Sequence, residues 1–262
     1  MLPRPIACAA ALLIAALLIA PLDAQAQSKA GSEAAAAEPC RSLSYRRNSY
    51  IVCELDLRRH VLKTYWKRQD GEAYGSIWGL VRRLWTDGKR PLFVMNAGMF
   101  HKDRSPVGLY VEDGKVLVDP DTADGEGNSY MKPNGVFFIA GDRAGVLETA
   151  RFLRDKPKVD FATQSGPMLV IDGALHPKIS PRGSSRHVRN GVGVRGPHTV
   201  VLAISMRPVT FGDLATLFKD RLGIANALYL DGSISGIYAA RMGPKHLFVP
   251  IGPMLGAYAR SH

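Results

Sequence analysis

Short runs rich in apolar residues, separated by turn residues, are the feature that most constrains the fold of this chain. Val107–Val111 and Lys115–Val118 flank the turn residues Glu112–Gly114, a composition typical of antiparallel strands joined by a tight turn. Gly135–Ala140 and Gly145–Thr149 flank a second glycine-containing turn in the same way. Because such hairpins outnumber helices, the sequence predicts a single α+β domain with a mixed, largely antiparallel sheet and a few packed helices.

A third hairpin and two helices complete this pattern. Tyr50–Leu57 and His60–Trp66 predict strands joined around two arginines. Two amphipathic segments predict helices, each beginning with a residue type that caps helix N-termini. The capping residues are Ser76 for the first helix, and Thr210 with Asp213 for the second.

The N-terminal residues 1–26 have the pattern of a secretory signal peptide. An apolar run covers Ile6–Leu22, and Ala24–Ala26 has the small-x-small pattern of a cleavage site. The run is shorter than a membrane-spanning helix requires, so we expect no stable membrane span after cleavage. Residues 27–39 predict a flexible leader and residues 40–262 the folded domain, in a periplasmic or secreted protein.

The formal net charge of +11 favours anionic partners. Cleavage of the signal removes one basic and one acidic residue, so the charge is unchanged. Phosphorylated or acidic glycans and the membrane surface fit an exported chain, and a generally basic surface that maintains solubility is the simpler alternative. Nucleic acid is disfavoured as a partner because the chain is predicted to be exported, and because no run of basic residues is interleaved with aromatic residues.

Two cysteines remain in the mature chain, and their context favours a disulfide. Cys40 and Cys53 are 13 positions apart, and paired cysteines are typical of exported proteins. A catalytic thiol is therefore disfavoured. The chain has no CxxC or HExxH and its seven histidines are scattered, so we expect no cofactor and assign no metal ligands, although a divalent metal stays open.

Two short motifs fail the structural context that their usual functions need. Residues 191–196 match G-x-G-x-x-G, but Pro197 and the predicted strand Thr199–Ser205 follow instead of a helix, which excludes a dinucleotide site. The glycines more plausibly allow another segment to approach the backbone. Residues 232–236 lack the central serine of G-x-S-x-G, which disfavours a serine hydrolase.

Four polar loops adjoin short apolar strands. They are Asn96–Phe100, Gln164–Met168, Arg189–Gly193 and Asp231–Ser235. If these loops converge, they bring a carboxylate, a guanidinium, amides and hydroxyls into one cleft. Taken singly, each loop is better explained as a structural turn, and only the four together favour a site. A further polar loop, Asp119–Asn134, is either a surface loop or a lid over a site.

The motifs in these loops resemble the phosphodiester glycosidase family, which includes the lysosomal uncovering enzyme, and especially its bacterial exported branch. Ala97, Met99 and Ile234 depart from the glycine-richer loops of the uncovering enzyme, which leaves the sugar open. The matching stretches are NAGMF (96–100), PVGLYVEDGK (106–115), MKPNGVFF (131–138), QSGPMLVIDG (164–173), RNGVGV (189–194) and ALYLDGSIS (227–235).

The resemblance implies hydrolysis of a sugar-1-phosphodiester between the anomeric carbon and the phosphate oxygen, on envelope or exopolysaccharide glycans. Asp231 is the expected base or oxocarbenium stabiliser. Arg189 is expected to stabilise the departing phosphate, with Lys132 as a weaker candidate. Glycosidases usually use two carboxylates, and Asp103 and Asp172 are the alternatives for the second.

The remaining predicted site residues would bind sugar hydroxyls, phosphate oxygens or water. The alternative function is a non-catalytic glycan-binding or polysaccharide-assembly protein on the same scaffold, and in either case the partner is a phosphorylated or phosphodiester-linked glycan. The predicted substrate-binding residues are Asn96, Gly98, Lys132, Asn134, Gln164, Ser165, Gly166, Asn190, Gly232, Ser233 and Ser235.

Overall fold

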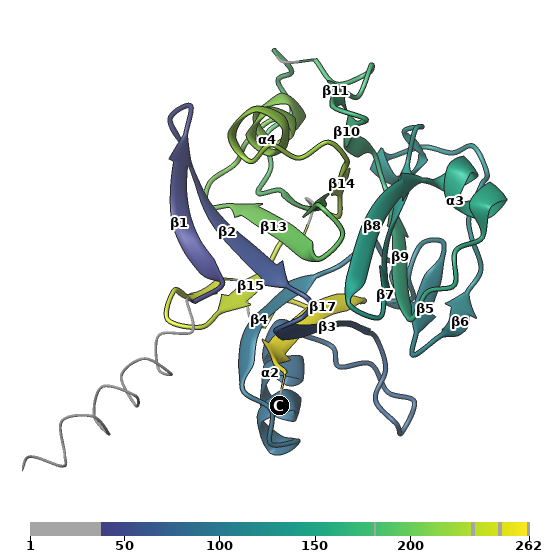
Figure 1. Cartoon of the computed structure of the whole chain (residues 1–262), viewed down its shortest axis with the longest axis vertical. Helices are drawn as coiled ribbons and strands as arrows, with labels where there is room; N and C mark the ends of the chain where they lie inside the picture. Colours follow the sequence, from purple (N-terminus) through teal and green to yellow (C-terminus); the bar gives the residue numbers. More distant parts are fainter. Residues whose placement is uncertain (1–37, 181, 232–233, 246–247, 261–262) are drawn as a thin grey trace, which may run out of the picture. The chain divides into compact units, whose positions relative to one another are not determined.

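The structure is a computed structural model that describes residues 38–180, 182–231, 234–245 and 248–260. The predicted signal peptide and residues 27–37 of the predicted leader lie outside these ranges. The described strands form three sheets, and every pairing within them is antiparallel (Figure 1). The prediction of an α+β domain dominated by antiparallel strands is confirmed.

The large sheet has seven strands, and the predicted site residues Arg189, Asn190 and Asp231 lie in or next to its strands β12 and β14. Its turn at Arg46 and Arg47, both with positive φ, joins the first two strands. In spatial order the strands are β1 (Cys40–Tyr45), β2 (Asn48–Asp56), β13 (Thr199–Ser205), β12 (Asn190–Arg195), β14 (Ala227–Tyr229), β10 (Met168–Ile171) and β11 (Ala174–Leu175).

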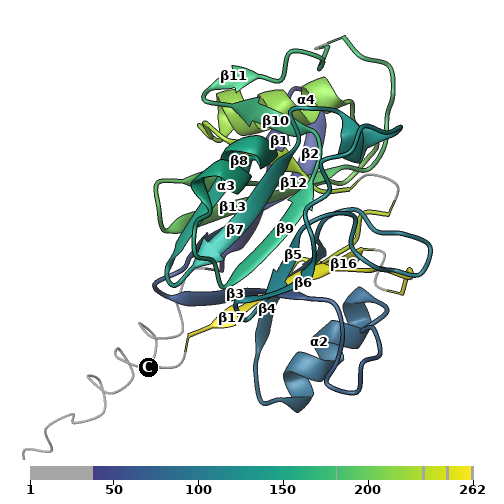
Figure 2. The same ribbon diagram turned by 90° about the vertical axis from the view of Figure 1, so that its right-hand side faces the viewer.

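The second and third sheets have five strands each (Figure 2). The second sheet runs β16 (Gly243–Lys245), β15 (Ile237–Ala239), β4 (Pro91–Asn96), β17 (Met254–Ala259) and β3 (His60–Tyr65). The third sheet runs β6 (Lys115–Val118), β5 (Tyr110–Glu112), β9 (Phe161–Ser165), β7 (Gly135–Ala140) and β8 (Arg143–Glu148).

The structure confirms two of the three predicted hairpins and corrects the other. β5 pairs with β6, and β7 pairs with β8, as expected. The predicted pairing of β2 with β3 is wrong: β2 pairs with β1 and β13, whereas β3 pairs with β17. The chain turns between β2 and β3, where Arg59 N–H donates to Asp56 O, but the turn sends the two strands into different sheets.

The helices begin at their predicted caps. Ser76 Oγ accepts from Gly79 N at 3.0 Å at the start of α2 (Ile77–Thr86). Thr210 and Asp213 form the predicted capping box of α4 (Phe211–Thr216), which continues as one π-helical turn over Leu217–Arg221. The other helical segments are α3 (Thr149–Asp155) and a 3₁₀ turn at Asn128–Tyr130.

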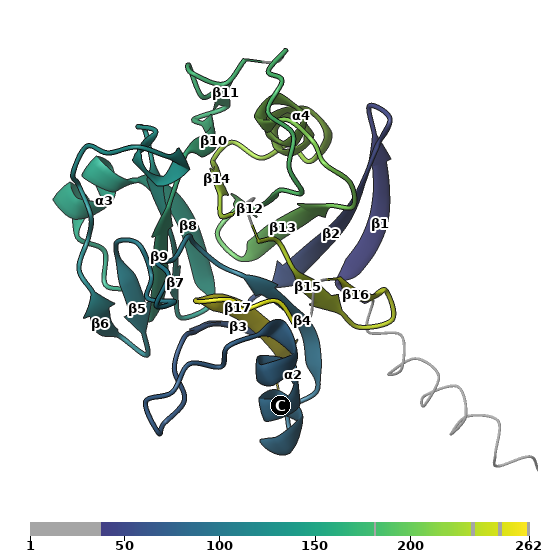
Figure 3. The same ribbon diagram turned by 180° about the vertical axis from the view of Figure 1, so that it is seen from behind.

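One apolar core lies between the three sheets, and each sheet buries its other face under a helix. The shared core includes Leu202 from the large sheet, Phe93 from the second and Phe137 from the third. Helix α4 covers the large sheet, α2 the second and α3 the third (Figure 3). Because the strands are covered on both faces, they need apolar residues at successive positions. This explains the continuous apolar runs in the sequence.

The N-terminal hairpin contains the predicted disulfide. Cys40 and Cys53 face each other in the β1–β2 register and are bonded. Glycines in β12 have the predicted packing role, since a Cβ on Gly191 would lie 2.9 Å from Leu228 O, and one on Gly193 would lie 2.5 Å from Ile224 Cγ2. Among the described residues, no helix is long and apolar enough to cross a membrane.

Candidate active site

The three sheets meet at the segment that follows β14. Buried Asn96, at the end of β4, accepts through Oδ1 from Asn190 Nδ2 at 2.7 Å and from Gly236 N at 3.0 Å. Asn190, at the start of β12, accepts through its own Oδ1 from Asp231 N at 3.0 Å. Two amide side chains from different sheets therefore hold the backbone at both ends of the loop 231–236.

The third sheet reaches the same segment through Ser165. Its buried hydroxyl, at the end of β9, donates to Leu230 O at 2.9 Å. Gly98, after β4, packs closely on β9, because a Cβ there would lie 2.7 Å from Gln164 O and 2.8 Å from Thr163 Oγ1. The structure therefore brings Asn96, Gly98, Ser165, Asn190 and Asp231 close together.

Asp231 is fixed through its backbone on both sides. Its N–H bonds to Asn190, and its carbonyl accepts from Asn190 N at 3.2 Å and from the Ser235 hydroxyl at 3.0 Å. The Ser235 hydroxyl also lies 2.9 Å from Val188 O. Asp231 is 6% exposed, so three hydrogen bonds to its backbone hold a nearly buried residue in place just after β14. The predicted ligand residues Gly232 and Ser233 lie outside the described ranges.

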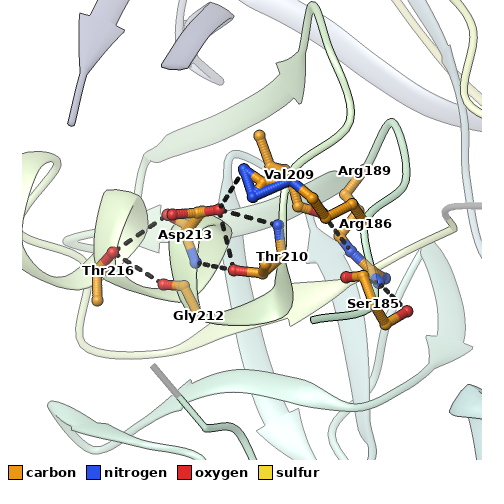
Figure 4. A network of polar contacts seen from close by, with 8 residues as sticks. All are labelled: Ser185, Arg186, Arg189, Val209, Thr210, Gly212, Asp213 and Thr216. Carbon is orange, nitrogen blue, oxygen red and sulfur yellow. Dashed lines mark hydrogen bonds and ion pairs between the residues drawn. The ribbon is translucent and has the colours of Figure 1, made fainter. Parts of the chain in front are cut away.

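Arg189 is almost fully buried and its donors are largely occupied (Figure 4). Nε donates to Val209 O, Nη1 to Tyr229 Oη and Nη2 to both oxygens of Ser185, at 3.0–3.2 Å. The guanidinium carbon stacks 3.7 Å from the ring centroid of Phe211. Since a guanidinium has five N–H donors, one N–H of Nη1 remains for a further acceptor.

The charge of Asp231 acts on the ring that Arg189 contacts. Burial raises the pKa of the Tyr229 phenol, the nearby Arg189 lowers it, and the Asp231 carboxylate raises it again. Burial likewise lowers the pKa of Arg189. The Tyr229 phenol therefore interacts with the charges of both predicted catalytic residues. Within the described residues, Arg189 forms no ion pair within 4.0 Å.

Figure 4 also shows how the segment before β12 is held against α4. Arg186 Nη2 lies 3.8 Å from Asp213 Oδ2, the same oxygen that accepts from Thr210 N and Thr210 Oγ1. The capping box therefore has a second role, because it also positions the segment 185–189 that carries the buried arginine.

The Asp119–Asn134 loop is fastened to the third sheet by Gln164. Gln164 Oε1 accepts from Leu109 N at 2.9 Å and Asp121 N at 3.0 Å, and its Nε2 donates to Asp121 O at 2.6 Å. Gln164 and Ser165, with Asp121, Ser129, Tyr130, Asn134 and Val107, line a cavity of about 10 Å³, room for about one water. Gln164 thus holds the loop Asp119–Asn134 against the third sheet, and residues of this loop share the cavity with Ser165.

The other predicted ligands on this side have structural contacts. Asn134 Nδ2 donates to Ser129 O at 2.9 Å. Gly166 packs closely, since a Cβ there would lie 2.8 Å from Asn134 Cβ. Exposed Lys132 pairs with Asp124 at 2.8 Å and donates to Thr122 O, so its ammonium stabilises the loop.

Neither predicted second carboxylate is brought to Asp231 by a described contact. Asp103 lies in an exposed turn and accepts from Ser105 N and Oγ. Asp172 bonds to Asn226, before β14, while Asp231 follows the same strand. Five residues of extended chain separate Asn226 from Asp231, about 16 Å, which is too far for a glycosidase pair at roughly 5–9.5 Å.

Asp121 and Tyr229 are the site residues that sequence reasoning missed. Asp121 lies three residues after β6, inside the polar loop Asp119–Asn134. Tyr229 is part of the apolar run before Asp231 and reads as core. No group of three or more His, Cys, Asp or Glu side chains able to hold a metal occurs in the described part of the chain.

Comparison with known proteins identifies relatives of this chain. The model of the phosphodiester glycosidase family matches residues 90–248. Uncharacterized protein YigE of Escherichia coli K12 is 38% identical over 177 residues, covering 68% of this chain and 69% of that protein.

Two solved structures share the fold at low sequence identity. The catalytic domain of zebrafish N-acetylglucosamine-1-phosphodiester alpha-N-acetylglucosaminidase, auto-inhibited by its pro-peptide, has a TM-score of 0.56 and 16% identity, over 84% of this chain and 82% of that chain. A hypothetical protein from Synechocystis has a TM-score of 0.53 and 12% identity, over 84% and 61% of the two chains. The motifs, the family model and the shared fold together place the chain in the phosphodiester glycosidase family.

Proposed function

We propose that this protein is an exported hydrolase that cleaves sugar-1-phosphodiester bonds in envelope or exopolysaccharide glycans. Membership of the family supports a glycosidase acting on phosphodiester-linked sugars. Export is supported by the apolar N-terminal run followed by a cleavage pattern, and by the Cys40–Cys53 disulfide, a bond typical of oxidising compartments.

The convergence of three sheets on Asp231 is the observation that carries the proposal. A general base or oxocarbenium stabiliser must be held rigidly at the reacting carbon. Asn190, Ser235 and the strand end of β14 fix the Asp231 backbone from both sides. This rigidity exceeds what a simple Asp-Gly turn needs, and it supports a catalytic role for the carboxylate.

Asp121 is our candidate for the second carboxylate. It lines the same cavity as Ser165, and the Ser165 hydroxyl binds the carbonyl of Leu230, next to Asp231. Its Oδ2 accepts from Tyr130 Oη at 3.1 Å, and Gln164 holds its backbone in place. Phosphate is a good leaving group, so a carboxylate that orients water suffices there without a strong general acid.

Arg189 supplies positive charge to the site through Tyr229. Its Nη1 donates to Tyr229 Oη at 3.0 Å, which orients the phenol. Because Arg189 is only 1% exposed, the expected direct bond to the departing phosphate is replaced by an indirect role. Its positive charge, close to the candidate site, would stabilise the developing negative charge through Tyr229.

The test is sugar release from a panel of glycosyl phosphodiesters, including UDP-sugars, with and without a chelator. We expect Asp231→Asn to abolish turnover, and Asp121→Asn to reduce it strongly, with circular dichroism unchanged. Asp103→Asn is the matched control, since its carboxylate lies in an exposed turn, and it should keep normal activity. Near-normal turnover by Asp231→Asn refutes the assignment.

A non-catalytic glycan-binding or assembly protein is the second candidate. It is favoured by the placement of Asp103 and Asp172, because neither lies with Asp231 as a conventional carboxylate pair. Glycan binding by the wild-type protein, together with no turnover across the whole panel, would establish this function instead.

A further inference from the structure

Two adjoining hollows lie along strand β3, away from the candidate active site. One has a volume of about 310 Å³ and includes Lys63 and Tyr65 in its lining. The other, of about 710 Å³, includes Val61 and Tyr258. Residues 61, 63 and 65 alternate along one strand and so point to the same face of the sheet. Asp87 and Lys89 line both hollows, which therefore form one groove, called here the β3 groove.

The β3 groove lies along β3, and β17 separates β3 from β4. At one end of the groove Val61 pairs with Tyr258, and at the other Tyr65 pairs with Met254, which in turn pairs with Asn96. Two strand spacings, about 10 Å, therefore separate β3 from Asn96. The lining of the two hollows includes neither member of the amide pair that holds Asp231.

Positive charge predominates in this groove after its ion pairs are counted. Arg83 pairs with Asp87 at 2.9 Å, and Lys63 pairs with Asp113 at 3.0 Å. The third lining carboxyl, Glu112, accepts from Tyr110 Oη at 2.7 Å, and burial raises its pKa. Four lining cations form no ion pair with a described residue: Lys67, Lys89, Arg90 and Arg260.

Aromatic rings hold three of these cations in place. The ammonium of Lys67 lies 4.2 Å from the centroid of Trp66, and that of Lys89 lies 5.0 Å from the centroid of Tyr258. The guanidinium carbon of Arg90 lies 6.0 Å from the Trp85 ring. A cation on a ring face keeps its charge available to an anion while it loses conformational freedom, so the groove is partly organised before any ligand binds.

We propose that the β3 groove binds an extended anionic glycan, a sugar chain that bears carboxylate or phosphate groups. The unpaired cations match the acidic groups, and the tyrosines lining the groove offer apolar ring surface to the sugars. A membrane surface fits less well, because membrane contact needs apolar side chains that protrude, whereas these residues line hollows. The groove would retain a polymer on the enzyme while a bond at the candidate active site is cleaved. Binding of the polymer in the groove does not itself require turnover.

The test is direct binding of the purified full-length protein to fluorescent polygalacturonate oligosaccharides, measured by anisotropy. Neutral dextran oligosaccharides of equal length and vesicles containing anionic phospholipid are the comparison ligands. We expect polygalacturonate to bind, dextran not to bind, and added salt to weaken binding. Equal binding of dextran, or tighter binding to the vesicles, overturns the proposal.

A double substitution locates the binding in the groove. Lys67→Gln/Lys89→Gln should raise the dissociation constant for polygalacturonate about tenfold. Lys158→Gln/Lys219→Gln removes the same charge from exposed positions outside the groove and should change it less than twofold. If both variants raised the dissociation constant equally, only the overall charge would matter, and the assignment of binding to the β3 groove would be refuted. Thermal unfolding of each variant verifies that the fold is retained.

Discussion

Replacement of Asn190 by alanine tests whether the buried amide pair holds the candidate site together. The side chain is fully buried and makes two hydrogen bonds, to Asp231 N at 3.0 Å and to Asn96 Oδ1 at 2.7 Å. Its removal leaves the buried Asp231 N–H without this acceptor, at a cost of about 1–3 kcal/mol, and leaves space where the amide was. We expect Asn190→Ala to lower the free energy of unfolding by roughly 2–4 kcal/mol.

The chain offers a matched control at the other end of β14. Asn226 also makes two hydrogen bonds through its side chain, both to Asp172, but in an exposed turn. Water can replace those partners, so Asn226→Ala should cost less than about 1 kcal/mol. Urea denaturation measures both variants, and for a domain of this size the Asn190 variant should also melt roughly 4–16 °C lower.

Two results would contradict this reasoning. A loss for Asn190→Ala no larger than that for Asn226→Ala means that the amide pair contributes nothing beyond a surface turn. A large loss of stability with full activity in the remaining folded protein means that the pair supports the fold but does not position Asp231. Activity per folded molecule, measured well below the melting temperature, separates the two roles.

Three further predictions concern the disulfide, a close approach and a carboxyl group. Cys40→Ser/Cys53→Ser should lower the free energy of unfolding by about 3 kcal/mol, as expected for a loop of this length, and reductant should then have no further effect. Gly98→Ala should lower stability and turnover together, because its Cβ meets backbone at 2.7 Å, whereas Gly183→Ala has room. Burial raises the pKa of Glu112 in the folded protein, so ionisation of this carboxyl destabilises the fold as the pH rises above about 4. Glu112→Gln should therefore raise the melting temperature at pH 7 and leave it unchanged at pH 4, as measured by thermal unfolding.

The sequence predicted local structure well where one or two neighbouring residues determine it. The Thr210–Asp213 capping box and the turn at Asp113 and Gly114 both have the predicted structure, because caps and tight turns depend on neighbouring residues. The β2–β3 hairpin failed for the opposite reason. Both strands have suitable local patterns, but each finds a partner from the last third of the chain, which no local pattern contains.

The candidate site likewise has features that local sequence predicts and features that it does not. Asn96, Asn190 and Asp231 could be identified because polar residues at the ends of apolar strands are unusual. Their mutual hydrogen bonds depend on how three sheets meet, which the sequence alone does not specify. Gln164 and Lys132 have the side chains of ligands, yet they bind the Asp119–Asn134 loop. A polar side chain that fastens a loop and one that meets a substrate look alike in a sequence.

The position of β17 in the second sheet has a consequence for how the chain folds. Strands β3 and β4 come early in the sequence, but β17, from Met254 to Ala259, lies between them. The N-terminal part of this sheet therefore cannot complete its pairing until nearly the whole polypeptide is present. Contacts between such distant segments make folding slow, so in a newly made chain this sheet is among the last parts of the domain to be completed.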